Sequence, residues 1–140
     1  SLQLVRDRSV QYGTSSVSKP DEVCTLFSRA YGEPDRELFV IVSLDTRNKP
    51  TTISMISQGT INSSLVHPRE VFKTALLANA ASIVLIHNHP SGDSSPSPED
   101  LTITRRLVRA GQLLGVEVVD HVIIGDGNYT SLRERGFLSA

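Results

Sequence analysis

The residues best suited to chemistry in this sequence are His87 and His89, with Asp100 following them. The apolar run over residues 82–86 leads straight into the histidines and suits a buried strand. In an extended chain residues two apart point the same way, so both imidazoles would face one side and Asn88 would point away. Two imidazoles and one carboxylate leave a coordination position for water, as in catalytic zinc sites.

A helix start fixes where Asp100 lies. Ser97 fits the N-cap position and Pro98 the first helical position, so Asp100 belongs to the first turn. The partial positive charge of a helix N-terminus favours a carboxylate there, and Asp100 can point back toward the loop that holds His89. Ser97 and Asp100 also approximate a capping box, so Asp100 can serve as a helix-start residue as well.

Apolar periodicity and turn signals predict the elements that must position these residues. Residues 1–18 are polar and serine-rich, which predicts an extended or mobile arm before a domain over residues 19–140. A single α/β domain follows, with a mixed β-sheet flanked by helices. We expect Leu76 and Leu114 to belong to the buried stripes of their helices. The expected helices cover about residues 20–31, 68–80 and 98–114, and the expected strands residues 38–44, 52–57, 82–86, 116–124 and 129–132.

Composition restricts the functional classes. The 140 residues suit one domain with an aliphatic core, and neither a membrane span nor a signal peptide is visible, so a cytoplasmic location is expected. Cys24 is the only cysteine, which excludes an internal disulfide and a cysteine-rich zinc site. The net charge of -1 means that the chain has no general excess of positive charge with which to bind the phosphates of DNA. Arg105, Arg106 and Arg109 fit a solvated helix face. Direct DNA binding by this domain is therefore not expected.

The string HNHPSGDSSPSPED resembles the JAMM (MPN) metallopeptidase motif. With VHPREVF before it and DHVIIGDGNYTSLRERG after it, the chain looks like the RadC family over about residues 35–136. This resemblance implies a JAMM/MPN, cytidine deaminase-like fold, with His87, His89 and Asp100 as Zn2+ ligands and Ser97 as a hydrogen-bond donor to the bound water or the developing oxyanion. RadC proteins have historically been labelled DNA repair factors, and full-length members typically carry an upstream helix-hairpin-helix segment that this sequence does not contain.

JAMM enzymes also use a glutamate as general base, placed at the start of an early strand. Glu37 opens the apolar run LFVIVSLD and is the first candidate, Glu33 is the second and Glu70 the third. Zinc lowers the pKa of its water from about 15.7 to about 7, so a nearby glutamate could take the proton and return it to the leaving amine. The expected substrate is a peptide, isopeptide or other amide, in a peptide or protein partner that the sequence does not identify.

Four other polar residues need an interpretation. Asp120 and His121 interrupt an apolar strand and point to opposite faces. His121 is either a partner of the site or a satisfied strand histidine, and Asp120 is structural. His67, just before Pro68, fits a capping or packing role. Asp93 could approach the metal from the loop, but its spacing matches no family ligand.

Two enzyme alternatives fail on sequence grounds. The contiguous word His-Asn-His is not how HNH nucleases present those letters, and a zinc deaminase needs Pro-Cys-x-x-Cys, which one cysteine cannot supply. A non-catalytic scaffold that binds a repair or recombination partner stays open, as do the oligomeric state and the native metal. Manganese, iron and cobalt compete with zinc at nitrogen and oxygen ligands.

Overall fold

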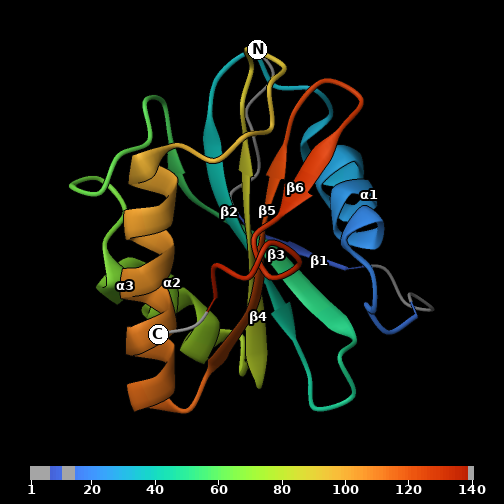
Figure 1. The fold of residues 1–140 in the computed structure, drawn as a ribbon. Coiled ribbons are helices and arrows are strands. Elements are labelled where there is room, and N and C mark those ends of the chain that lie inside the picture. The colour runs from blue at the N-terminus through green and yellow to red at the C-terminus, as the bar shows by residue number, and fades with distance from the viewer. Residues whose placement is uncertain (1–6, 11–14, 139–140) are drawn as a thin grey trace.

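The computed structural model describes residues 7–10 and 15–138, which form a three-layer α/β domain with one sheet between helices (Figure 1). The single α/β domain with a mixed sheet, predicted from the sequence, is confirmed. Within the described residues the elements are β1 (Asp7–Ser9), α1 (Pro20–Tyr31), β2 (Leu38–Leu44), β3 (Pro50–Gln58), α2 (Pro68–Leu77), β4 (Ser82–Asn88), α3 (Pro98–Leu114), β5 (Glu117–Ile124) and β6 (Tyr129–Ser131).

The sheet has the strand order β1-β3-β2-β4-β5-β6. Among the strand pairs of the described residues, only β4 and β5 are parallel, and α3 supplies the crossover that a parallel pair requires. Strand β4 lies inside the sheet between β2 and β5, and all its residues are buried. The end of β4 therefore meets the start of antiparallel β2, where Phe39 pairs with His87, and the end of parallel β5, where Ile123 pairs with His87.

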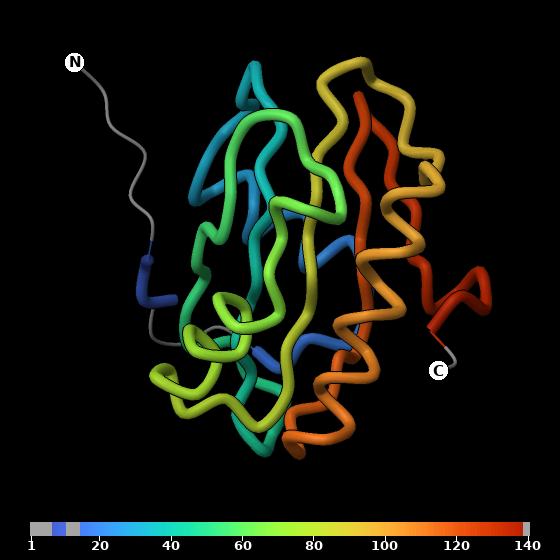
Figure 2. The backbone as a smooth tube through the Cα atoms, turned by 90° about the vertical axis from the view of Figure 1, so that its left-hand side faces the viewer, coloured from blue at the N-terminus to red at the C-terminus, as the bar shows by residue number. Residues whose placement is uncertain are grey.

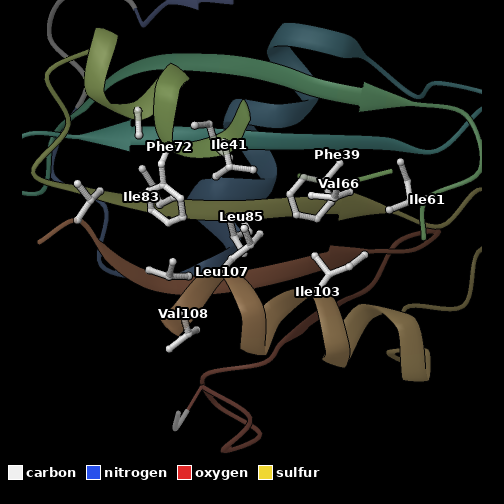
Figure 3. Packing of buried hydrophobic residues seen from close by; sticks show 14 residues of the cluster. Phe39, Ile41, Ile61, Val66, Phe72, Ile83, Leu85, Ile103, Leu107 and Val108 are labelled. Atoms are coloured by element: carbon white, nitrogen blue, oxygen red, sulfur yellow. The ribbon is translucent and has the colours of Figure 1, made fainter. Parts of the chain in front are cut away.

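Each face of the sheet has its own core. Helices α2 and α3 cover one face and α1 covers the other (Figures 1 and 2). Because successive strand residues point to opposite faces, Leu85 packs under α2 and α3 with Phe72 and Leu107 (Figure 3), whereas Ile86 joins the α1 cluster with Phe27. By the same alternation, the side chain of His87 points to the face covered by α2 and α3, and the side chain of Asn88 points to the face covered by α1.

Residues 7–9 of the predicted polar arm form a strand, which the sequence did not indicate. Strand β1 pairs with β3 at the edge of the sheet, and its three residues are exposed. Because Asp-Arg-Ser carries no apolar alternation, the pairing depends on main-chain hydrogen bonds that leave no side-chain pattern. The parts of the arm at residues 1–6 and 11–14 lie outside the described residues.

The predicted burial of Leu76 and Leu114 is wrong, since they are 55% and 52% exposed. Both residues lie in the last turn of their helices, and periodicity does not show how far the sheet extends beneath a helix. In the part of the chain that the structure describes, no helix combines the length and the apolar character needed to cross a bilayer.

The buried helix residue Gly111 gives a test of this packing. A methyl group built there would overlap the carbonyl oxygen of Val116 and would lie 3.4 Å from the ring of Phe72. We expect Gly111→Ala to lower the free energy of unfolding by about 1–3 kcal/mol, because overpacking outweighs the better helix propensity of alanine. Thermal unfolding followed by circular dichroism measures this, with Gln112→Ala at the neighbouring exposed position as control. Equal unfolding temperatures for both variants would contradict the packing.

Candidate metal centre

The end of β4 brings two imidazoles together. His87 is buried within the strand, and His89 follows it, with its backbone N–H donating to Ile124 O at 2.8 Å so that the chain stays beside β5. The ring centroids are 4.8 Å apart and the rings are nearly perpendicular, at 87°. The two side chains share one side of the strand, as their spacing predicts.

The carboxylate of Asp100 lies between the two rings. Its Oδ1 is 3.1 Å from His87 Nδ1, and its Oδ2 is 3.1 Å from His89 Nε2. Asp100 also completes a capping box, since Oδ2 accepts from Ser97 N at 2.9 Å and Asp100 N donates to Ser97 Oγ at 3.0 Å. Asp100 is therefore a helix-start residue, as expected, and its carboxylate also lies beside both histidines. Ser97 Oγ accepts in this box, so its own proton stays available for another acceptor.

His89 is oriented by the loop that follows it. Its Nδ1 lies 2.8 Å from the carbonyl oxygen of Asp93, which can only accept, so Nδ1 carries a proton and a neutral His89 presents the Nε2 lone pair toward Asp100. The carboxylate of Asp93 accepts from Ser95 N at 2.9 Å. Asp93 thus supports the site through its carbonyl group and through the turn of its loop.

The three side chains fit a metal ion. Among the described residues, neither ring nitrogen of His87 has a partner in hydrogen-bond geometry, although its side chain is only 2% exposed. A buried imidazole without a well-directed hydrogen bond is costly, and coordination by a metal would satisfy it. One ligand atom from each of His87, His89 and Asp100 can be chosen so that all lie within 4.8 Å of one another.

The protonation of the site follows from the same contacts. Burial alone would raise the pKa of Asp100, but the contacts with His87 and His89 and the hydrogen bond from Ser97 N outweigh it and hold this pKa well below its usual range. The hydrogen bond to Asp100 raises the pKa of His89 against the opposing effect of burial. Without metal, the pair is therefore an ionised carboxylate beside an imidazole that binds a proton more readily than usual.

Glu37 is the glutamate whose carboxylate lies beside His87. It directly precedes β2, and its Oε2 lies 3.7 Å from His87 Nε2 while accepting a hydrogen bond from Ile61 N at 2.8 Å. Its side chain is 31% exposed and so accessible to solvent. By contrast, Glu33 lies on the wall of a cleft beside His89, and Glu70 lies in the first turn of α2.

Asn88 holds the segment that carries Glu37, a role that sequence reasoning missed. Its Oδ1 accepts from Leu38 N at 2.7 Å, and its Nδ2 donates to Arg36 O at 3.0 Å. These bonds hold the residues on both sides of Glu37 to the end of β4. Strand alternation correctly turned Asn88 away from the histidines, but no local signal shows that residues about fifty positions earlier bind it.

A buried hydrogen-bonded chain connects β5 with the turn that carries Asp100. Thr104 Oγ1 donates to Asp100 O at 2.6 Å and therefore accepts from His121 Nδ1, also at 2.6 Å. Burial lowers the pKa of His121 to about 3, so the ring is neutral and Nδ1 carries its proton. Of the two interpretations of His121, the structure favours a partner of the site that acts through Thr104.

The remaining two polar residues lie away from the histidine pair. Asp120 is structural, as expected, because its carboxylate accepts from Ser131 Oγ at 2.6 Å and from Arg133 N at 3.0 Å on the opposite face of the sheet. His67 occupies the N-cap position of α2, but its side chain makes no capping hydrogen bond and is exposed. The capping or packing role predicted for it is wrong, because the backbone and Pro68 start the helix without it.

Comparison with known proteins agrees with this geometry. The family described as "RadC-like JAB domain" matches residues 17–137. The chain belongs to the RadC family. UPF0758 proteins of Methanosarcina mazei and Desulfitobacterium hafniense are 48% and 54% identical over 122 residues, 87% of this chain and 53% and 54% of theirs. A UPF0758 protein of Caldanaerobacter subterraneus is 50% identical over 129 residues, 92% of this chain and 55% of its own length. The RadC-type chain described here spans about half the length of these relatives.

Thr104 tests whether the chain from His121 positions Asp100. Thr104→Val removes both hydrogen bonds, and we expect zinc affinity to fall about 10–100-fold, the usual cost of losing a group that orients a ligand. Thr104→Ser keeps the hydroxyl and should retain most of the affinity. Titration of zinc against a chelator measures both variants. Thr102→Val is the matched control, because it removes an exposed hydroxyl that donates to Pro98 O. Native affinity in Thr104→Val would contradict the positioning role.

Metal affinity should depend on pH because His89 binds a proton where a metal would bind. Its pKa lies above the ordinary value of 6.5, so protons compete increasingly as the pH falls through that raised pKa. Asp100, with its lowered pKa, stays ionised throughout. We expect zinc affinity, measured from about pH 8 to about pH 5, to weaken steadily on the acidic side. An affinity that does not change over this range would be inconsistent with His89 as a ligand.

Proposed function

We propose that this chain is a zinc-dependent metallohydrolase of the JAMM type that cleaves an amide bond in a peptide or protein. The observation that carries the proposal is the convergence of three metal-ligating side chains with the accessible carboxylate of Glu37 at one end of the sheet. Glu37 lies near His87 but is not one of the three candidate metal ligands, so its carboxylate is free for proton transfer.

The ligand set supports zinc as the native metal. Two imidazoles and one carboxylate form the set of protein ligands found in open catalytic zinc sites, although manganese, iron and cobalt also bind such nitrogen and oxygen ligands. When bound, zinc would polarise a substrate carbonyl and lower the pKa of a water molecule from about 15.7 to about 7. His87, His89 and Asp100 would hold it.

The residues around the metal ligands have separate tasks in this proposal. Glu37 accepts a proton from the attacking water and later delivers it to the leaving amine, which accounts for its position at the solvent-accessible side of His87. Ser97, whose hydroxyl proton is not used in the capping box, donates to the oxygen that becomes negative in the transition state. Asn88 and the backbone of Ile61 restrict the movement of Glu37.

We also propose that the reaction takes place in the cytoplasm, that its substrate is a peptide or protein, and that this domain does not contact DNA directly. A scaffold that binds a repair or recombination partner would need neither the exposed carboxylate of Glu37 nor a ligand set with room for water. The two functions therefore differ in whether Glu37 matters.

The experiment compares Glu37→Gln with the native chain, both loaded with zinc. Each protein is incubated with a mixture of peptides and with denatured proteins, and new amino termini are identified by mass spectrometry. We expect the rate of cleavage to fall about 10²–10⁴-fold in Glu37→Gln, with zinc content and unfolding temperature unchanged, because only the proton acceptor is lost.

Glu70→Gln is the matched control, since it removes one of the other glutamates that the sequence offers, and that residue does not line the cleft beside His89. This variant should cleave at a rate close to that of the native protein. Cleavage that survives Glu37→Gln, or no cleavage by the zinc-loaded native chain, would overturn the hydrolase and favour the scaffold.

A further inference from the structure

A cleft of about 510 Å³ opens beside His89 on the α1 side of the sheet. Its walls are the middle of α1, the segment 32–34 after that helix, the loop 88–92 and the turn 124–129. His89 belongs both to this wall and to the candidate metal centre. A chain bound in the cleft would therefore lie next to the metal ligands.

The outer wall of the cleft is fixed by bonds between two segments distant in sequence. Gly92 O accepts from Asp126 N at 2.9 Å and from Asn128 Nδ2 at 3.2 Å. A methyl group built at Gly125 would overlap Gly92 O, so the two backbones are in close contact. This loop and turn form one preformed wall, which reduces the ordering cost of binding.

The lining combines apolar surface with negative charge. The lining includes the apolar residues Phe27, Ile124 and Tyr129, and two acidic residues from different segments, Glu33 and Asp126. Among the residues that the structure describes, no lysine or arginine lines the cleft. A long aliphatic stem that ends in a cation matches both properties, because the stem packs on apolar surface while its charged end stays near the exposed carboxylates.

We propose that this cleft binds the side chain of a lysine or arginine in a peptide substrate, beside the amide bond presented to the metal centre. The proposal rests on the proposed hydrolase for the place of that amide bond. Binding in the cleft itself does not require turnover. Because Glu33 and Asp126 are exposed, they select for a cation without adding much affinity, and added salt should weaken the selection.

The test uses zinc-loaded Glu37→Gln chain, so that no probe is cleaved, and follows backbone amide signals by NMR. The probes are acetyl-Gly-Lys-Gly-amide, its norleucine analogue, which keeps the aliphatic stem without the ammonium group, and its glutamate analogue. We expect the lysine probe to shift the signals of Gly92 and residues 125–129 and to bind about threefold more tightly than the norleucine probe, the modest preference that exposed carboxylates allow. That preference should disappear in a Glu33→Gln, Asp126→Asn double variant.

Glu70→Gln with Glu117→Gln is the charge-matched control, since it removes two exposed carboxylates that do not line the cleft. It should keep the preference for lysine. Equal binding of the three probes, shifts confined to other residues, or no binding at millimolar concentration would each overturn the cleft proposal. Lysine-selective binding in a chain that never cleaves a peptide would overturn the hydrolase and leave the cleft, so the two failures can be distinguished.

Discussion

The buried carboxylate of Asp100 is the constraint on which the rest of the site depends. It is 1% exposed, and a charge removed from water in this way needs partners on every side. Two imidazoles and the N-terminus of α3 supply them. Asp100 and the two histidines could also hold a metal, because a dication could take the place of the proton that His89 binds beside Asp100. The same carboxylate thus both stabilises the start of α3 and places an oxygen ligand beside the two histidines.

The topology of the sheet brings the other participants to the same place. The loop after β4 lies at the carboxyl end of a parallel strand pair, where connections leave the sheet and side chains can converge. Because β2 runs antiparallel to β4, the residue just before β2 lies beside the last residues of β4, and this residue is Glu37. Asn88 then uses the opposite face of β4 to hold the start of β2. A different strand order would separate the candidate base from the metal ligands.

Local sequence signals predicted the parts of this structure that depend on neighbours in the chain. The bounds of β2 follow from an apolar run that ends at a polar turn. Strand alternation predicts the common side of His87 and His89, and capping chemistry predicts the helix start at Ser97. The choice of Glu37 over Glu33 and Glu70 needed a resemblance to known enzymes, since sequence alone gives no distance to the histidines.

Contacts between segments that are distant in sequence could not be predicted from local sequence patterns. The bonds of Asn88 to residues 36 and 38, the contact between Thr104 and His121, and the cleft between α1 and the turn after β5 all join segments distant in sequence. Local patterns also predicted two features that the structure does not have. Leu76 is exposed because periodicity does not show how much of the sheet lies beneath the end of a helix. His67 makes no capping hydrogen bond because its position before Pro68 does not show whether the helix start needs its side chain.

The measurement that tests the central claim most directly is the metal content of the purified, untagged chain beside a His89→Ala, Asp100→Asn double variant. Elemental analysis after dialysis against zinc should find about one zinc per native chain and none in the variant, since two of the three protein ligands are gone. A native chain that binds no metal even after zinc is supplied, or a variant that retains as much zinc as the native chain, would contradict a metal centre at His87, His89 and Asp100.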